Sequence, residues 1–130
     1  MMELDIISNL FSALQNAELS RKRDCLIAPT SKLMGNVLRL LQKEGYLGEF
    51  EFIDDGRGGK FRIQLLGRVN RCGPIKPRFP VRRSEILDWA KMFLPARDIG
   101  VLVISTPKGL MTHEQCIESN TGGVLLGYVY

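Results

Sequence analysis

Positive charge is concentrated in one segment of this 130-residue chain, between Gly56 and Ser84. The segment contains no Asp or Glu and nine cationic residues, namely Arg57, Lys60, Arg62, Arg68, Arg71, Lys76, Arg78, Arg82 and Arg83. Half of the 18 Lys and Arg residues of the whole sequence therefore lie in it. Cations without nearby anions are typical of a surface that binds a polyanion. Because phosphate backbones release counterions when they are neutralised, nucleic acid is the first candidate and an anionic membrane surface the second.

A second group of chemically capable residues follows an apolar run near the C-terminus: Ser105, Thr106, Lys108 and Gly109. Hydroxyl groups can donate to and accept from base edges and the RNA 2′-hydroxyl. The lysine can reach phosphate, and the glycine lets a backbone approach a base closely. Ser, Thr, Pro and Gly also populate ordinary turns for conformational reasons, so the composition alone leaves both interpretations open.

Thr30, Ser31 and Lys32 form a third candidate contact, because they precede an apolar helical pattern. The N-terminus of a helix exposes unpaired N–H groups and a positive dipole end, and both suit phosphate. Capping of the helix alone would explain Thr30 and Ser31. A lysine in the first turn opposes the dipole unless an anion lies nearby, so Lys32 favours the binding interpretation.

Catalysis and metal binding receive little support from the sequence. His113 and Cys116 are three residues apart and could pair as a base and a thiol. However, no nucleophile elbow, Walker loop or metal-spaced carboxylates accompany them. A zinc site made from His113 with Cys25, Cys72 and Cys116 would lack the usual close pairs of ligands. We predict three reduced thiols, no catalysis, no cofactor and no small-molecule substrate.

Composition predicts an ordinary folded protein with a modest excess of positive charge. The formal net charge is +4, and 45% of the residues are hydrophobic, which is enough to fill a core. No apolar run approaches the roughly 20 residues that cross a bilayer. The first five residues include two acidic ones, whereas a secretory signal begins with basic residues. We therefore expect a soluble, intracellular protein that does not enter a membrane.

Periodicity predicts five elements before the middle of the chain. Apolar residues at helical spacing follow Asp5, which we expect to cap the first helix, and Thr30 or Ser31 is placed to cap the second. Alternating residues on both sides of the Asp54–Gly59 turn predict a hairpin. The expected order is helix 5–17, strand 25–28, a helix from about 32 to Gly45, strand 47–53 and strand 60–66.

The second half should contain one main helix and a buried sheet. Ser84 is placed to cap a helix over 85–94 with Leu87 on its buried side, and apolar runs at 99–104 and 124–130 predict buried strands. Thr112 and Gln115 fit a capping box for a short helical turn. The fold class is thus mixed α/β (α+β) in two small packed lobes, an N-terminal α-β-α-β-β lobe over 1–66 and a β-rich lobe over 67–130.

Several strings of the chain together resemble the family of the small-subunit ribosomal protein S8. They occur in the family's order and spacing from end to end, which makes the resemblance specific. The strings are Pro29-Thr30-Ser31-Lys32-Leu33, Glu44-Gly45-Tyr46-Leu47-Gly48, Gly67-Arg68-Val69-Asn70-Arg71-Cys72-Gly73, Lys76-Pro77-Arg78-Phe79, Leu94-Pro95-Ala96-Arg97-Asp98, residues 105–112, Gly122-Gly123 and Gly127-Tyr128-Val129-Tyr130. The forms around Arg78 and Arg97 are similar to those of archaeal members.

The resemblance implies a cytoplasmic ribosomal protein that binds the central domain of small-subunit ribosomal RNA, supports its assembly and touches neighbouring ribosomal proteins. It places Ser105, Thr106, Lys108 and Gly109 near bases, and it adds the Gly122-Gly123 pair to the RNA-binding set. Pro107 departs from the family pattern of Ser or Thr, and it has neither a hydroxyl nor a backbone donor. Val124 stands where bacterial members often have Glu.

We predict a division of labour between two kinds of contact on one continuous face. The cations Lys32, Arg57, Lys60 and Lys108, together with Arg78 and Arg82, would supply affinity. Ser105 and Thr106 would supply the choice of site. A free-standing RNA-binding regulator that uses the same surface is the alternative function, and the sequence does not separate the two.

Overall fold

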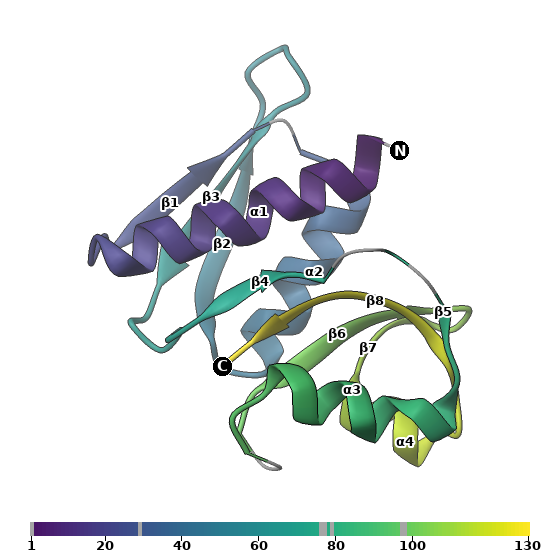
Figure 1. The fold of residues 1–130 in the computed structure, drawn as a ribbon. Helices are drawn as coiled ribbons and strands as arrows, with labels where there is room; N and C mark the ends of the chain where they lie inside the picture. Colours follow the sequence, from purple (N-terminus) through teal and green to yellow (C-terminus); the bar gives the residue numbers. More distant parts are fainter. Residues whose placement is uncertain (1, 29, 76–77, 79, 97–98) are drawn as a thin grey trace. The chain divides into compact units, whose positions relative to one another are not determined.

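The computed structural model describes residues 2–28, 30–75, 78, 80–96 and 99–130, and for residues 2–5 it describes the backbone only. The chain divides into two compact units, Met1–Asn70 and Arg71–Tyr130, which can be followed by colour in Figure 1. Each unit combines helices with an antiparallel sheet, which confirms the predicted mixed α/β class.

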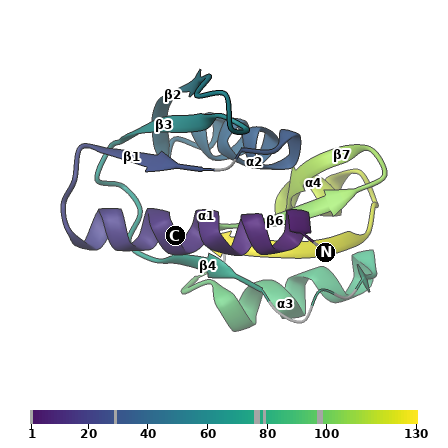
Figure 2. The same ribbon diagram turned by 90° about the horizontal axis from the view of Figure 1, so that it is seen from above.

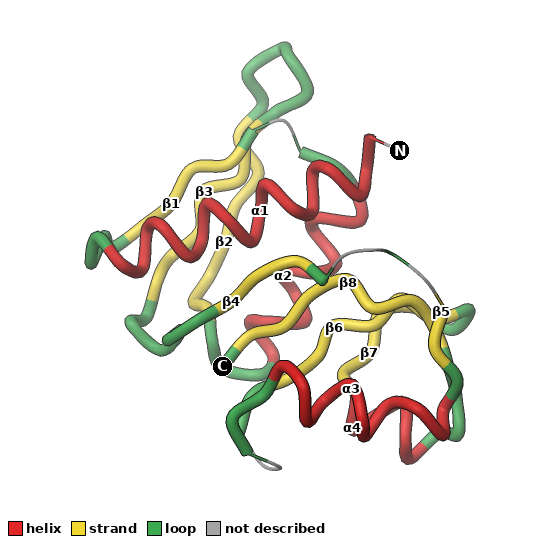
Figure 3. Tube along the Cα trace, in the orientation of Figure 1, coloured by secondary structure: helices red, strands yellow, loops and turns green. Residues whose placement is uncertain are grey.

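The first unit contains the five elements expected from the sequence, in the expected order. Its strands form one antiparallel sheet in the order β1-β3-β2 (Figure 3). The elements are α1 (Met2–Leu19), β1 (Asp24–Ile27), α2 (Lys32–Lys43), β2 (Leu47–Ile53) and β3 (Lys60–Leu65). Both helices lie on the same face of the sheet, since Cys25 Sγ of β1 lies 3.9 Å from the Ala13 carbonyl of α1 and Gly35 of α2 abuts the ring of Phe61.

The limits of α2 follow from its two terminal residues. Ser31 caps the N-terminus, because its Oγ accepts a hydrogen bond from the Met34 N–H at 3.1 Å. The helix ends before Gly45, which has a φ of +85°, and the N–H of Tyr46 returns to the Leu41 carbonyl at 3.0 Å. Of the two hydroxyl residues that the sequence offered, Ser31 is therefore the cap and Thr30 is free for another contact.

Helix α1 is longer than its apolar pattern predicted. It begins at Met2, so Asp5 lies inside the helix and its predicted role as the cap is wrong. Nothing in residues 2–4 opposes a helix, because Met, Glu and Leu all have high helix propensity. The expected apolar stripe is buried, with Ile7, Leu10 and Phe11 at 0% exposure.

The second unit is built around β8, the last strand. The sheet order is β4-β8-β6-β7, and β5 also pairs with β8; Figure 2 shows α3 running along this sheet. The elements are β4 (Cys72–Pro74), β5 (Pro80–Val81), a 3₁₀ turn (Arg83–Glu85), α3 (Ile86–Phe93), β6 (Val101–Thr106), β7 (Gly109–Thr112), α4 (His113–Glu118) and β8 (Gly123–Val129). One core joins both helices to the sheet and includes Ile86, Ala90, Leu102, Ile104, Cys116 and Leu125.

Three expectations for this unit need correction. Ser84 lies within the 3₁₀ turn instead of capping a helix, and the Glu85 carboxylate accepts from the Arg82 N–H at 2.9 Å. Leu87 was expected on the buried side of α3 but is 43% exposed. Strand β7 was not foreseen, because Pro107 and Gly109 made this stretch look like a loop. The predicted capping box of Thr112 and Gln115 is confirmed at the start of α4.

Candidate nucleic-acid interface

Two of the predicted contact regions meet in the first unit. Thr30 Oγ1 donates a hydrogen bond of 2.6 Å to the carbonyl oxygen of Gly58, which lies in the turn between β2 and β3. This bond joins the start of α2 to the Asp54–Gly59 turn, although the two residues are 28 positions apart in the chain. The segment that contains Thr30, Ser31 and Lys32 therefore lies next to the turn that contains Arg57, and Lys60 begins the strand that follows this turn.

The Asp54–Gly59 turn is shaped by its own two carboxylates. Asp55 Oδ1 accepts hydrogen bonds from the N–H groups of Arg57 at 2.8 Å and Gly59 at 2.9 Å. Asp54 Oδ1 accepts one from the Gly56 N–H at 3.0 Å. The bonds from Arg57 and Gly59 lower the pKa of Asp55, and the charge of Lys60 adds to this to a smaller extent. Sequence reasoning recognised the turn but missed Asp55, although Asp and Gly together are a signature of such turns.

Positive groups surround this junction. The side chains of Lys32 and Arg57 are exposed and that of Lys60 is partly exposed, and none has a salt bridge to a carboxylate in the described part of the chain. Because the first N–H groups of a helix have no partner within it, those of Lys32 and Leu33 add a positive dipole end. Such a group of charges is suited to a phosphate.

The expected loop after Ile104 is instead a tight β-hairpin in the second unit. Thr106 of β6 pairs with Gly109 of β7, and Pro107 and Lys108 are the two turn residues between them. The Thr106 hydroxyl accepts from the Lys108 N–H at 3.1 Å and donates to the Gly109 carbonyl at 2.7 Å. Its proton is therefore engaged within the turn. Ser105 is half-buried, whereas Lys108 and Gly109 are exposed at the tip.

The paired glycines have a structural explanation. A Cβ added to Gly122 would lie 2.6 Å from the Val81 carbonyl oxygen, and one added to Gly123 would overlap the carbonyl oxygen of Ser105. Backbones from β5 and β6 thus approach the start of β8 more closely than a side chain allows. A direct contact of Gly122 or Gly123 with RNA stays a prediction.

The remaining predicted cations of the second unit differ in environment. Arg78 is half-buried, and its guanidinium donates to the carbonyl of Ile75. Arg82 has an exposed side chain next to the 3₁₀ turn. Lys76 of the basic segment lies outside the described residues, as do Pro29, Pro77, Phe79, Arg97 and Asp98 of the family-like strings.

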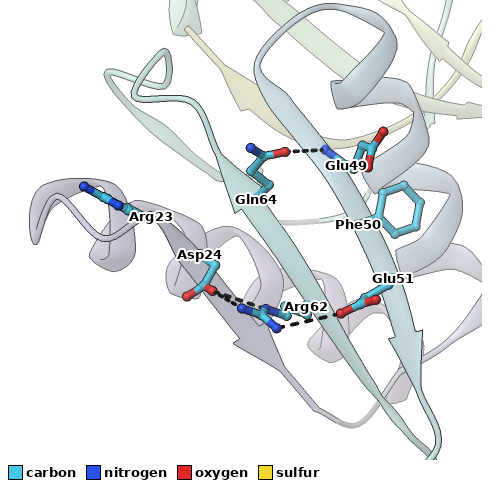
Figure 4. A pocket seen from close by; sticks show the side chains of 7 residues that line it. All are labelled: Arg23, Asp24, Glu49, Phe50, Glu51, Arg62 and Gln64. Atoms are coloured by element: carbon cyan, nitrogen blue, oxygen red, sulfur yellow. Dashed lines mark hydrogen bonds and ion pairs between the residues drawn. The ribbon is translucent and has the colours of Figure 1, made fainter.

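One cation of the basic segment, Arg62, forms ion pairs within the fold. The expectation that the cations of this segment lack nearby carboxylates is therefore wrong for Arg62. Arg62 of β3 bonds to Asp24 of β1 at 3.0 Å, and its guanidinium lies 4.0 Å from a Glu51 carboxylate oxygen on β2 (Figure 4). These partners come from the neighbouring strands, so the local sequence could not reveal them. The surrounding hollow on the outer sheet face is lined by Arg23, Asp24, Glu49, Phe50, Glu51, Arg62 and Gln64.

The His113 and Cys116 side chains are unsuited to acid–base or nucleophilic chemistry. His113 is buried, and burial lowers its pKa, while Nδ1 accepts from the Leu102 N–H at 3.2 Å. Burial raises the pKa of the Cys116 thiol, which is the opposite of what an activated nucleophile requires. The three cysteines are buried and none forms a disulfide, and no cluster of three metal-ligating side chains occurs in the ranges described above. None of the described helices has the length and apolar character to cross a membrane.

Comparison with known proteins gives a full-length match. The family model described as Ribosomal protein S8 matches residues 5–130. The chain is 55% identical over 130 residues to the small ribosomal subunit protein uS8 of Pyrobaculum neutrophilum, covering 100% of both chains. It is 52% identical over 133 residues to the uS8 protein of Desulfurococcus amylolyticus, also with 100% of both covered. These relatives are archaeal ribosomal proteins and not enzymes. The chain belongs to the ribosomal protein S8 family.

Proposed function

We propose that this chain is a structural component of the small ribosomal subunit that binds the central domain of small-subunit ribosomal RNA directly and supports its assembly. The observation that carries the proposal is the hydrogen bond between Thr30 and Gly58. It joins the helix start at Lys32 to the turn that contains Arg57 and is followed by Lys60, and this supports a junction that would bind an anion. The relatives are small ribosomal subunit proteins, which supports ribosomal RNA as the polyanion that this junction would meet.

Affinity would come from the exposed cations of both units. An RNA helix hides its major groove, so a protein binds its phosphates, 2′-hydroxyls and distorted bases. Lys32, Arg57 and Lys60 would contact phosphate in the first unit, and Lys108 with Arg82 in the second. Arg78 is the weakest candidate of the set, because its guanidinium already donates to a carbonyl of its own unit.

Site choice would come from the hairpin tip of the second unit. Ser105 has a hydroxyl that we assign to a base edge or a 2′-hydroxyl. Thr106 has its proton engaged with Gly109, so we assign it the task of holding Lys108 and Gly109 in place. Gly109 is exposed and has no side chain, so its backbone is accessible to a flat base.

Neighbouring ribosomal proteins would cover surfaces that repel RNA. The outer face of the first sheet carries Asp24, Glu49 and Glu51 around the neutralised Arg62 (Figure 4). Carboxylates disfavour phosphate at close range, so we place protein contacts rather than RNA there.

Binding to a transcript of the RNA central domain tests the function. We expect tight binding at moderate salt, a steep loss of affinity as salt rises, and weaker binding to an unrelated duplex. The alternative, a free-standing RNA-binding regulator, uses the same groups. Co-sedimentation with small ribosomal subunits supports the structural role, and absence from those fractions favours the regulator. Equal affinity for both RNAs would contradict specific recognition.

A further inference from the structure

An acidic pair lies in the middle of the cationic junction of the first unit. Asp54 and Asp55 are separated from Arg57 by Gly56 alone, and two negative charges at a phosphate-binding turn should weaken RNA binding through simple repulsion. Their presence in that turn therefore requires a physical reason.

The hydrogen bonds of Asp55 supply that reason. One carboxylate oxygen, Oδ1, accepts the N–H groups of both Arg57 and Gly59, at 2.8 and 2.9 Å. Gly56, Gly58 and Gly59 have φ values of +73°, +93° and +81°, so the chain passes through left-handed conformations that an unconstrained turn would leave easily. Because the N–H groups of Arg57 and Gly59 both donate to one carboxylate oxygen, the backbone between them is restrained. This restraint sets the direction in which the Arg57 side chain leaves the backbone.

Thr30 holds the same turn from outside. Its hydroxyl donates to the carbonyl of Gly58, the residue between the two N–H groups that Asp55 binds. The next residue is also fixed, because the Ser31 hydroxyl accepts a hydrogen bond from the Met34 N–H at the start of α2. The turn, the helix start and Lys32 are thus connected through hydrogen bonds of adjacent residues.

We propose that Asp55 and Thr30 are positioning residues for the RNA phosphate backbone: together they hold the turn that carries Arg57 beside the start of α2, so the Asp55 carboxylate favours RNA binding despite its charge. The inference rests on the proposed function. A preorganised set of donors binds more tightly than a mobile one, because less conformational entropy is lost on binding.

Replacement of Asp55 by Asn separates positioning from electrostatics, since the two predict changes of opposite sign. Asp55→Asn removes a negative charge, which alone would tighten binding to RNA. The amide oxygen is also a weaker acceptor than a carboxylate, so the turn loosens. We expect Asp55→Asn to weaken binding to the central-domain transcript by about threefold to tenfold.

Asp54→Asn is the matched control. It removes the same charge from the adjacent position, but Asp54 accepts a single N–H, that of Gly56. We expect its affinity for RNA to equal or exceed that of the unmodified chain. If Asp55→Asn and Asp54→Asn both tighten binding, the carboxylate is merely repulsive and the positioning role is overturned.

Two substitutions of Thr30 test the outer anchor. Thr30→Val keeps the shape of the side chain and loses the hydroxyl, whereas Thr30→Ser keeps the hydroxyl. We expect Val to weaken RNA binding and Ser to preserve it. Equal affinity of the Val variant and the unmodified chain would remove Thr30 from the proposal.

Amide hydrogen exchange provides a readout that does not depend on RNA. In the free protein, Asp55→Asn should speed exchange at the Arg57 and Gly59 N–H groups, while exchange at the amides of the first sheet stays unchanged. Unchanged exchange at both amides would contradict the mechanism. If the unmodified chain fails to bind the transcript, the proposed function falls with the inference; if it binds and Asp55→Asn binds equally well, only the inference falls.

Discussion

The backbone N–H of Leu102 donates a hydrogen bond to Nδ1 of His113 at 3.2 Å in the second unit. This bond requires an unprotonated Nδ1, so the neutral ring carries its proton on Nε2. His113 is the only histidine of the chain, and it is 3% exposed at the start of α4.

The buried His113 predicts a loss of stability in mild acid. Burial lowers its pKa in the folded state below the ordinary value of 6.5, so the unfolded chain takes up the proton first. The stabilisation is complete above that value and is lost as the pH falls through 6.5 toward the folded pKa. Urea unfolding at about pH 7.5 and about pH 5.5 should show a lower midpoint in the acid sample.

His113→Gln is the control for this pH dependence, because it cannot titrate. Its midpoint should change little between the two pH values. Asp55 does not contribute to this pH dependence, because its pKa lies below the ordinary 3.8 and it titrates at a more acidic pH. A stability that is flat across the neutral range in the unmodified chain would contradict the assignment to His113.

Lys60 and Arg62 provide a matched pair for the electrostatics of RNA binding. Both belong to β3, but Arg62 is bonded to Asp24 and Lys60 has no salt bridge to a described carboxylate. Lys60→Ala should weaken binding to every RNA and reduce the slope of log affinity against log salt by about 1. Arg62→Ala should leave the slope nearly unchanged. Equal slopes for Lys60→Ala and the unmodified chain would remove Lys60 from the phosphate contacts.

Ser105 should control the choice of RNA. Ser105→Ala is expected to weaken binding to the central-domain transcript by about 1–3 kcal/mol, with little effect on an unrelated duplex. Ser119→Ala, which removes a hydroxyl beyond α4 in the same unit, is the control. Equal losses on both RNAs would place Ser105 outside the recognition of bases.

Thr106 should behave as a structural residue of the hairpin tip. Thr106→Val removes the hydroxyl that bonds to Lys108 and Gly109 and should lower the free energy of unfolding by about 1–2 kcal/mol. Thr106→Ser keeps the hydroxyl and should restore most of this loss. Denaturant unfolding measures the effect. Full stability of the Val variant would show that the two bonds contribute nothing.

Gly123 and Gly109 contrast close packing with an open turn. Gly123→Ala would place a methyl group on the Ser105 carbonyl oxygen and should destabilise the second unit by about 1–3 kcal/mol. A Cβ at Gly109 meets nothing within 4 Å, so Gly109→Ala should lower the free energy of unfolding only through the strain of its positive φ. Urea unfolding of both variants checks the order. A Gly123→Ala chain as stable as the original would contradict the close approach of β6 and β8.

Local sequence patterns were sufficient to predict the structure wherever residues close in the sequence determine it. The alternation in Lys60–Leu65 places Phe61, Ile63 and Leu65 inside, and all three are buried. Ser31 and Gly45 likewise mark the limits of α2, because a cap and a left-handed residue act within one turn of the helix.

Contacts between distant segments could not be derived in this way. Arg62 and Asp24 are 38 positions apart in the chain, and Thr30 and Gly58 are 28 positions apart. No periodicity of the sequence encodes either contact. The role of Thr106 was also hidden, because a hydroxyl in a Gly- and Pro-containing stretch suits either a ligand or the turn itself. Its partners became known only from the geometry of the hairpin.

The position of β8 has a consequence for the order of events during synthesis. Strands β4, β5 and β6 all pair with β8, so the second sheet cannot close before residues 123–129 have been translated and have left the exit tunnel. The strand pairings of the first unit lie within residues 24–65 and can form while the rest is still being made. The cationic junction at Thr30 and Gly58 can therefore form before the sheet that supports the hairpin tip at Ser105 is complete.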